Sequence, residues 1–281
     1  LVNIDGFIGF MNTPILKATK PNETLQFYTQ GDYDSWKESH QNAKGYKIKY
    51  YKGLGTSTSK EFKEYFKEKR IVSFIQQKED SILIDKIFNK QKADERKKWL
   101  GEYDRNRYLN VETKTISYEQ FIDNELIHFS KYDCDRSIPN GVDGMKLSQR
   151  KILFSAFKKR LYQEIKVAQF SGYVSEQSGY HHGEASLNGA IVNMAQDFVG
   201  SNNIHLLLPN GQFGTRLQGG KDSASERYIY TKLNPLTRLI FRKEDDCILN
   251  YLDDDGLSVE PVFYVPIIPM VLVNGALGIG T

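Results

Sequence analysis

A glycine-rich stretch between residues 211 and 230 constrains the fold more than any other part of the chain. Four of its residues are glycines: Gly211, Gly214, Gly219 and Gly220. Glycine at this density marks a backbone that turns sharply or approaches another group closely. The stretch carries two cations, Arg216 and Lys221, and ends in the pair Arg227-Tyr228. We therefore expect a basic loop that leads into a tyrosine with an arginine beside it.

The Arg227-Tyr228 pair has a chemical interpretation and a plain one. A tyrosine hydroxyl, with an ordinary pKa of about 10, is a poor nucleophile until a neighbouring cation or base assists it. Attack on a phosphodiester also needs positive charge where the transition-state oxygens develop negative charge. An arginine next to a tyrosine on a basic loop supplies part of both. The plain alternative is a loop that leads into a strand carrying an ordinary aromatic residue.

Length and composition limit the classes of protein that fit. A chain of 281 residues, 40% hydrophobic and 26% charged, is long enough for one large or two ordinary domains. No apolar run approaches the roughly 18 residues of a membrane span, so we expect no membrane partner. Cys134 and Cys247 lie far apart and match no metal spacing, which favours a reducing compartment. Because the chain begins without Met and ends in the glycine-rich run Gly278-Ile-Gly-Thr281, we expect a fragment of a longer protein.

Charge is concentrated between Gly141 and Arg160. The single acid in this segment is Asp143, and its cations are Lys146, Arg150, Lys151, Lys158, Lys159 and Arg160. A local basic face on a chain of net charge +3 indicates a polyanionic partner. The alternative is an ordinary solvated helix face.

The first 136 residues predict a small α/β unit followed by charged helices. Residues 45–51 alternate in the manner of a strand, and Thr58 with Glu61 forms a capping box for a helix. The glycine turn between them makes a plausible phosphate-facing corner. An exposed helix over 90–99 and another helix over 116–129 are expected to connect this unit to the next.

Residues 141–200 predict a helix-turn-helix unit. An apolar stripe from Met145 to Leu161 marks the first helix, Gly172 and Gly179 mark a break, and Leu187 to Phe198 mark the second helix. The Tyr180-His-His-Gly-Glu184 sequence precedes that second helix. Histidines at a helix N-terminus favour the neutral imidazole, which can donate a hydrogen bond to a phosphate or relay a proton. They do not fit a zinc site, because adjacent histidines do not share a helix face and no third ligand stands nearby; packed or solvated histidines are the alternative.

The remaining segments predict a wing and a strand-like tail. Residues 227–231 are β-rich and suit the wing of a winged helix, and Asn234-Pro235 starts a short helix that runs to Phe241. Residues 260–275 have a strand-like composition interrupted by prolines. Ile279, between two glycines, is either a wedge that inserts between base pairs or a buried plug.

Together these segments resemble the DNA cleavage core of eukaryotic-type (type IIA) DNA topoisomerase II, the single-chain enzyme of eukaryotes and large DNA viruses. The resemblance runs in one order through almost the whole chain. It is carried by Tyr50-Tyr-Lys-Gly-Leu-Gly-Thr-Ser-Thr-Ser-Lys-Glu61, Tyr180-His-His-Gly-Glu184, Phe198-Val-Gly-Ser-Asn-Asn203, Gly211-Gln-Phe-Gly-Thr-Arg216, Gly219-Gly-Lys-Asp222, Arg227-Tyr-Ile-Tyr-Thr231 and Ile267-Ile-Pro-Met270.

The resemblance implies an α/β and α+β multidomain fold. Residues 1–70 would be the C-terminal part of a TOPRIM domain and residues 71–136 a helical linker. Residues 137–248 would form a CAP-like winged-helix DNA cleavage domain, and residues 249–281 the start of a tower domain.

The resemblance also implies roles for individual residues. Tyr228 would link covalently to the 5′ phosphate of DNA, with Arg227, Arg150 and His182 contacting the phosphate, and Ile279 would intercalate and bend the duplex. Further DNA contacts are expected from Lys151, Lys158, Lys159, His181, Arg216 and Lys221.

The implied partners are double-stranded DNA and a second copy of the chain, in the nucleus or, for a virus, in the host cytoplasm or viral factory. The Mg²⁺ ligands and the ATPase domain would lie upstream of Leu1, so we expect no metal site within this chain. The sequence departs from the family at Leu147-Ser148, Glu226 and Leu277, none of which is a proposed catalytic residue. The alternatives are a non-catalytic winged-helix DNA-binding module and a metal-dependent hydrolase, for which the ligands are missing.

Overall fold

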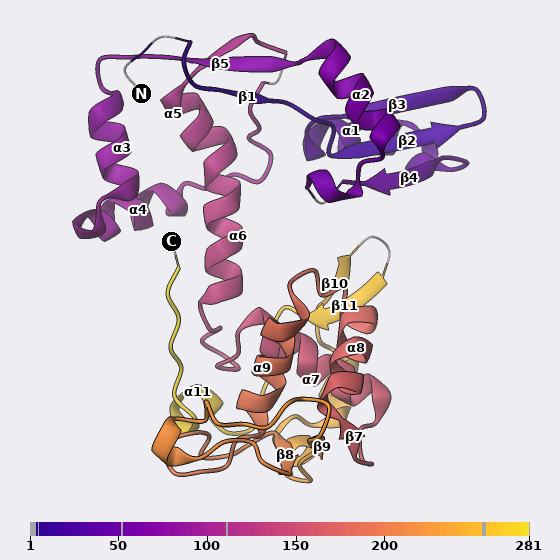
Figure 1. Ribbon diagram of the computed structural model, residues 1–281, viewed down its shortest axis with the longest axis vertical. Coiled ribbons are helices and arrows are strands. Elements are labelled where there is room, and N and C mark those ends of the chain that lie inside the picture. The colour runs from indigo at the N-terminus through magenta and orange to yellow at the C-terminus, as the bar shows by residue number, and fades with distance from the viewer. Residues whose placement is uncertain (1–3, 5, 52, 111, 255–256, 281) are drawn as a thin grey trace. The chain divides into compact units, whose positions relative to one another are not determined.

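The computed structural model describes residues 4, 6–51, 53–110, 112–254 and 257–280, so Lys52 of the expected phosphate-facing corner and Thr281 lie outside the described residues. The chain divides into two compact units, Leu1–Lys131 and Tyr132–Thr281 (Figure 1). Within the described residues, no helix combines the length and apolar character needed to cross a membrane.

A three-stranded antiparallel sheet and one helix form the first core of the N-terminal unit. The strands, in the order β3-β2-β4, are Glu23–Phe27, Leu16–Lys20 and Lys47–Tyr50. Helix α1 (Gln30–Ser39), capped by the Thr29 hydroxyl, packs Tyr33 against Leu16, Ala18 and Phe27. The strand expected within residues 45–51 is confirmed as β4.

Helix α2 (Ser59–Glu68) begins with the predicted capping box, in which Thr58 and Glu61 satisfy each other's backbone amides. The Glu61 carboxylate is buried and also accepts from Lys49 Nζ at 2.8 Å and Lys17 Nζ at 3.5 Å. These two lysines therefore serve the packing of strand against helix rather than an open phosphate-facing corner.

A second sheet joins distant parts of the same unit, across residue 70. Its strands, in the order β1-β5-β6, are Gly9–Met11, Ile71–Ile75 and Thr115–Ser117, with β1 antiparallel and β6 parallel to β5. The helices that follow are α3 (Asp80–Phe88), α4 (Ala93–Gly101), α5 (Tyr118–Phe121) and α6 (Ile127–Ser137), with a π-helical turn over Ile122–Leu126. Trp99 of the expected exposed helix is buried, so α4 packs rather than standing free.

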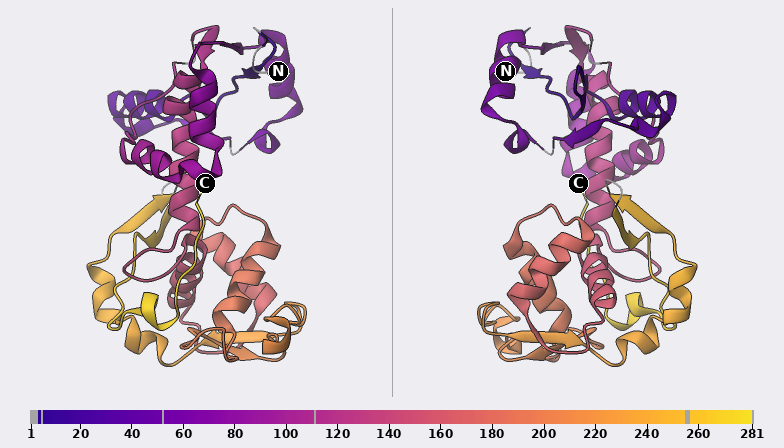
Figure 2. Two further views of the ribbon diagram at one scale, coloured as in Figure 1. Left: turned by 90° about the vertical axis from the view of Figure 1, so that its left-hand side faces the viewer. Right: turned by 90° about the vertical axis from the view of Figure 1, so that its right-hand side faces the viewer.

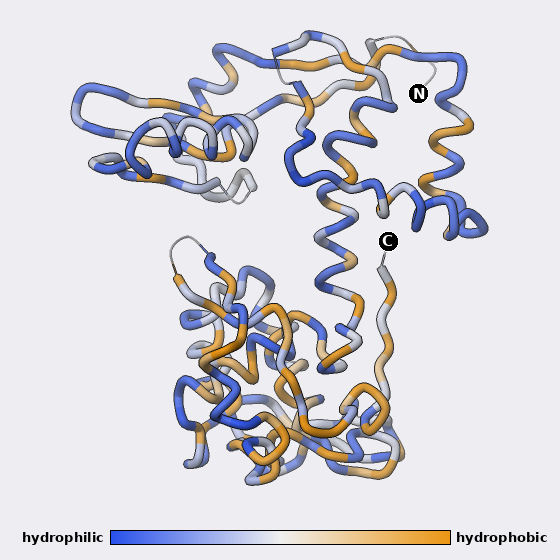
Figure 3. The backbone as a smooth tube through the Cα atoms, turned by 180° about the vertical axis from the view of Figure 1, so that it is seen from behind, coloured by the Kyte–Doolittle hydropathy of each residue, from blue (hydrophilic) through white to orange (hydrophobic). Residues whose placement is uncertain are grey.

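The C-terminal unit has the predicted winged-helix arrangement of three packed helices and a three-stranded antiparallel sheet. The helices are α7 (Leu147–Lys159), α8 (Val167–Ser178) and α9 (Glu184–Ala195). The strands, in the order β7-β9-β8, are Ile165–Lys166, Tyr230–Leu233 and Leu207–Asn210. Their core includes Ile152, Phe170, Ile191 and Leu207, each fully buried. Hydrophobic residues accordingly recur along the helices of this unit (Figure 3).

The predicted break at Gly172 is wrong, because Gly172 lies inside α8. Val167, Phe170 and Val174 of this helix are all fully buried, and that packing outweighs the roughly 1 kcal/mol that glycine costs in a helix interior. Gly179, in the left-handed conformation with φ of +57°, ends the helix as predicted.

The strand-like interpretation of residues 260–275 is correct only at its beginning. Strands β10 (Tyr251–Asp254) and β11 (Leu257–Pro261) form an antiparallel hairpin, visible in both views of Figure 2. Pro266 and Pro269 lack the amide that a strand ladder needs, and the chain turns instead into α11 (Met270–Val273). Helix α10 (Thr237–Ile240) starts three residues after Asn234, whose side chain accepts from Leu236 N.

Candidate nucleic-acid interface

The glycine-rich loop between β8 and β9 is held by specific hydrogen bonds. Asp222 accepts from both the amide and the hydroxyl of Thr215, each at 2.8 Å. These two bonds hold the pKa of Asp222 below its usual range, so the carboxylate stays charged. A Cβ at Gly214, which has a φ of +101°, would lie 2.6 Å from the backbone of Gly220. The glycines are therefore needed for one backbone to lie against another.

Tyr228 projects from this loop at a doubly anchored turn. Its amide donates to Ser225 O at 2.9 Å, while the carbonyls of Glu226 and Ile229 accept from Ala168 N and Val167 N at the start of α8. Ile229 is buried, but the Tyr228 side chain is 75% exposed and Arg227 beside it is exposed. The turn thus holds the tyrosine in a fixed place and leaves its hydroxyl open to a large substrate.

A groove of about 810 Å³ runs between this loop and α9. Lys221 and Arg227 line one wall, and the exposed Arg216 lies on the same loop outside the groove. Asn188 of α9 also lines it, and within the described residues its buried Oδ1 has no hydrogen-bond partner. The groove offers cations and an unused acceptor to a polar ligand.

Two cations of α7 are not on the exposed basic face that we expected. Arg150 is 5% exposed and donates through Nε and Nη2 to Asp143, at 2.8 and 3.1 Å. Lys151 is also buried, and its Nζ donates to Glu260 Oε2 at 2.9 Å. The expectation fails because a buried charge must be paired, and Asp143 and Glu260 supply the partners.

The exposed basic surface of α7 is formed by Lys158 and Lys159 instead. Their ammonium groups lie over aromatic rings, 5.4 Å from the Phe154 centroid and 4.4 Å from the Tyr173 centroid. The aromatic rings hold the lysine stems while the charges remain open to solvent.

Replacing Lys158 and Lys159 with Ala should weaken binding about equally on unrelated DNA duplexes, because backbone phosphates carry no sequence information. The slope of log affinity against log salt should flatten by roughly 1 to 2. Fluorescence anisotropy at several salt concentrations measures both quantities. The matched control is Lys97→Ala with Lys98→Ala, which removes two adjacent charges from α4. A large loss on one sequence alone would contradict the expectation.

The two histidines before α9 have different partners. His181 Nε2 lies 2.9 Å from Asp254 Oδ2, whereas His182 lies beside Tyr132 and Arg136 of α6. Desolvation, followed by the charges of Arg136, His181 and Lys151, lowers the pKa of His182. The expected direction is correct, although the nearby side chains rather than the helix end are the cause. Among the described residues, no group of three or more His, Cys, Asp or Glu is placed to hold a metal ion.

Ile279 is 80% exposed, so it is not a buried plug. A Cβ at Gly278 would collide with Ser137 and Pro139, and one at Gly280 would lie 2.7 Å from Cys134 Sγ. The two glycines therefore allow the backbone to pass closely along the end of α6, and Ile279 between them faces solvent.

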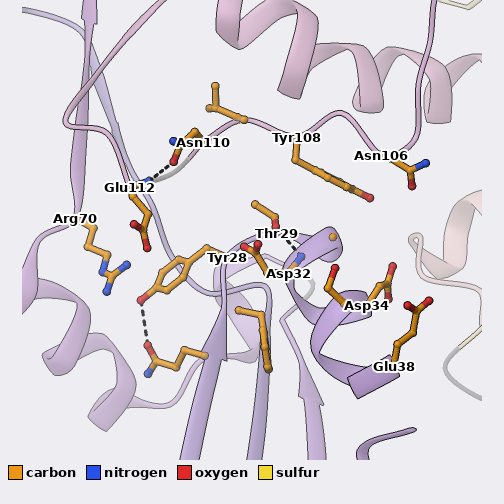
Figure 4. A pocket seen from close by; sticks show the side chains of 15 residues that line it. Tyr28, Thr29, Asp32, Asp34, Glu38, Arg70, Asn106, Tyr108, Asn110 and Glu112 are labelled. Carbon is orange, nitrogen blue, oxygen red and sulfur yellow. Dashed lines mark hydrogen bonds between the residues drawn. The ribbon is translucent and has the colours of Figure 1, made fainter. Parts of the chain in front are cut away.

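The other large cavity, about 910 Å³, lies in the N-terminal unit and has the wrong charge for DNA. Figure 4 shows the carboxylates of Asp32, Asp34, Glu38 and Glu112 around it, with Arg70 as a cation. An acidic lining repels phosphates, which leaves the α9 groove as the better candidate.

Sequence reasoning missed Asp143, Tyr132, Arg136 and Asp222 as parts of the site. Asp143 had a signal, since it is the single acid in a strongly basic segment and a buried arginine needs a partner. Tyr132 and Arg136 had none. Among the described residues, no hydrogen bond, ion pair or ring contact joins Tyr228 to Arg150 or His182 within one copy of the chain.

An exposed Arg-Tyr pair on an anchored loop of a winged-helix domain defines the class of type IIA topoisomerase cleavage domains. Residues 136–281 match the family of DNA gyrase and topoisomerase IV, and residues 11–134 match the C-terminal associated domain of TOPRIM. The chain belongs to the DNA gyrase/topoisomerase IV family, and here both matched regions lie on one chain.

The chain is similar to eukaryotic members of this class. It is 54% identical to DNA topoisomerase 2 of Arabidopsis thaliana, over 100% of this chain and 20% of that protein. It is 54% identical to the mitochondrial DNA topoisomerase 2 of Dictyostelium discoideum, over 98% of this chain and 22% of that protein. It thus spans about a fifth of the length of these relatives.

A solved structure agrees with this assignment. The crystal structure of the Plasmodium falciparum topoisomerase II DNA-binding, cleavage and re-ligation domain matches with a TM-score of 0.85 and 49% identity. The match covers 100% of this chain and 39% of that one. The resemblance seen in the sequence is confirmed, and the relatives favour the enzyme over a non-catalytic DNA-binding module.

Proposed function

We propose that the chain is part of an ATP-dependent DNA topoisomerase that breaks both strands of a duplex, passes a second duplex through the break and reseals it. The observation that carries the proposal is the exposed Tyr228 on its anchored turn, beside Arg227 and the α9 groove. Two strands need two tyrosines, so we propose a homodimer acting on double-stranded DNA. The eukaryotic relatives support a nuclear location, or a viral factory if the source is a virus.

The chemistry is a transesterification with no net loss of a phosphodiester. The Tyr228 oxygen gives up its proton and attacks phosphorus, and the bond from phosphorus to the 3′ oxygen breaks. The 3′ oxygen leaves with a proton, while the 5′ phosphate stays on the tyrosine. Resealing reverses these steps, so it needs no added energy source.

The proposed phosphate contacts divide by exposure. Arg227 is exposed, and His182 as a neutral imidazole donates one hydrogen bond to a phosphate oxygen. Arg150 has both Nε and Nη2 bound to Asp143, so we assign the phosphate to its remaining Nη1 group. Such fixed donors stabilise charge without having to reorganise during the reaction.

We propose Mg²⁺ and ATP as cofactors of the whole protein. The carboxylates described in this chain do not form a metal site, so no step is assigned to a metal here. Lys151, Lys158, Lys159, His181, Arg216 and Lys221 remain proposed DNA contacts, with Lys151 acting through the packing it maintains.

Covalent trapping tests this function. The full-length protein is incubated with supercoiled DNA and then denatured rapidly. We expect protein linked to 5′ ends of the DNA, and peptide mapping should place the linkage on Tyr228. A linkage at another residue, or no linkage at all, would remove the basis of the proposal.

Replacing Ile279 with Ala should preserve binding of linear DNA but reduce its bending. A wedge that unstacks one base step costs a few kcal/mol, which bent DNA recovers through additional contacts with protein. Alanine is too short to hold the step open, so cleavage should fall roughly tenfold or more. Energy transfer across an end-labelled duplex measures the bend. Leu277→Ala, which removes an equally exposed side chain two residues away, is the control. Unchanged bending in Ile279→Ala would refute the wedge role.

A further inference from the structure

Two side chains of α6 hold His182. Tyr132 Oη lies 3.2 Å from His182 Nε2, and Arg136 Nη1 lies 3.3 Å from Nε2 and 3.4 Å from Nδ1. The Tyr180 ring packs against the imidazole edge to face, at 5.5 Å and 76°. All of these residues belong to the Tyr132–Thr281 unit, so the arrangement is internal to one compact body.

Arg136 is itself fixed in place. Its Nη2 donates to Asp133 Oδ1 at 2.9 Å, and Asp133 is buried. Its guanidinium carbon lies 5.8 Å from the Tyr132 ring centroid. One amino group is thus tied to the helix, and the other is directed at the imidazole.

Hydrogen-bond chemistry decides which form of His182 suits this arrangement. A guanidinium only donates, and a neutral imidazole has one acceptor nitrogen whereas an imidazolium has none. Protonation of His182 would therefore remove the acceptor for Arg136 Nη1 and place two cations in contact. The other titratable groups facing the ring are Tyr132 and Tyr180, with His181 and Lys151 adding positive charge nearby.

We propose that Arg136 is a positioning residue for DNA cleavage, which holds His182 neutral and oriented for the scissile phosphate, with Tyr132 fixing the ring beside it. This proposal rests on the proposed function for the identity of the phosphate. A neutral, fixed imidazole gives one directed hydrogen bond, and the adjacent guanidinium supplies the attracting charge. Neither residue needs to touch the reacting atoms.

Titration of His182 in the 281-residue chain tests the proposal without DNA. The chain has five histidines, so labelling at the imidazole Cε1 gives five signals, and the signal lost in His182→Gln identifies His182. We expect Arg136→Gln to raise the pKa of His182, because the neighbouring cation and donor are removed. Arg136→Lys keeps the cation and should restore much of the lowering. Arg242→Gln removes an exposed arginine elsewhere and should leave the titration unchanged.

Tyr132→Phe is a second variant that keeps the exposed ring and removes only the oxygen near Nε2. We expect it to change the tautomer of His182, which ¹⁵N chemical shifts of the imidazole detect, while the fold is kept. An unchanged His182 titration in Arg136→Gln, together with an unchanged tautomer in Tyr132→Phe, would overturn the proposal.

Cleavage by the full-length protein gives the functional readout. Because a raised pKa keeps His182 charged to higher pH, the acid limb of the cleavage profile should move to higher pH in Arg136→Gln. A purely structural role would lower cleavage equally at every pH, which would overturn the proposal. Absence of a covalent adduct in the unsubstituted protein would instead refute the proposed function, so the two failures are distinguishable.

Discussion

Replacing Tyr228 with Phe should abolish the covalent protein–DNA complex of the full-length protein while duplex binding stays within a few-fold. The substitution keeps the ring and its surroundings and removes only the oxygen that we assign as the nucleophile. Since the Tyr228 side chain is largely exposed and the turn is held through backbone atoms, neither the loop nor the fold should change. Denaturing gels of trapped complexes and anisotropy of labelled DNA measure the two quantities separately.

The control for this experiment is Tyr230→Phe. Tyr230 lies two residues further on, in β9, with its ring 6.0 Å from Lys166 Nζ, and it also has an exposed surface. We expect its variant to cleave normally. Residual covalent complex in Tyr228→Phe, with loss of the complex in Tyr230→Phe, would move the nucleophile to Tyr230.

Replacing Asp143 with Ala should destabilise the C-terminal unit by about 3–5 kcal/mol, the usual cost of leaving a buried charge unpaired. Asp143 is 1% exposed and accepts from Arg150 Nε and Nη2, and also from the amides of Met145 and Tyr264. Its loss leaves the Arg150 guanidinium and both amides without that acceptor. The same change should impair cleavage, because Arg150 loses the partner that positions it.

The positions of the two tryptophans make this measurement specific. Trp36 and Trp99 both lie in the N-terminal unit, so their fluorescence follows that unit, whereas circular dichroism follows both. Asp143→Ala should move the urea transition seen by circular dichroism and leave the fluorescence transition in place. Asp246→Ala breaks the partly exposed pair with Arg238 and should cost at most about 1 kcal/mol. Equal effects of the two substitutions would show that burial of the Asp143 pair has no special weight.

Several parts of the fold and site were predictable because their causes lie within a few residues of one another. The capping box at Thr58 and Glu61, the strand ending at Tyr50 and the apolar stripe of α7 are of this kind. The glycine-rich loop ending in Arg227-Tyr228 is another, since glycine spacing and the adjacent cation can be read directly from the chain. Motifs in a fixed order then indicated the family.

Other features required the tertiary structure. The burial of Arg150 and Lys151 depends on partners distant in the chain: Glu260 is 109 residues from Lys151, and Asp143, which also pairs with Arg150, accepts from an amide 121 residues away. Arg136 and His182 are 46 residues apart. Helical periodicity places a cation on a face, but it does not show whether that face meets solvent or a carboxylate from elsewhere. Packing between distant segments decides this, because a charge is buried only where the fold brings it a partner.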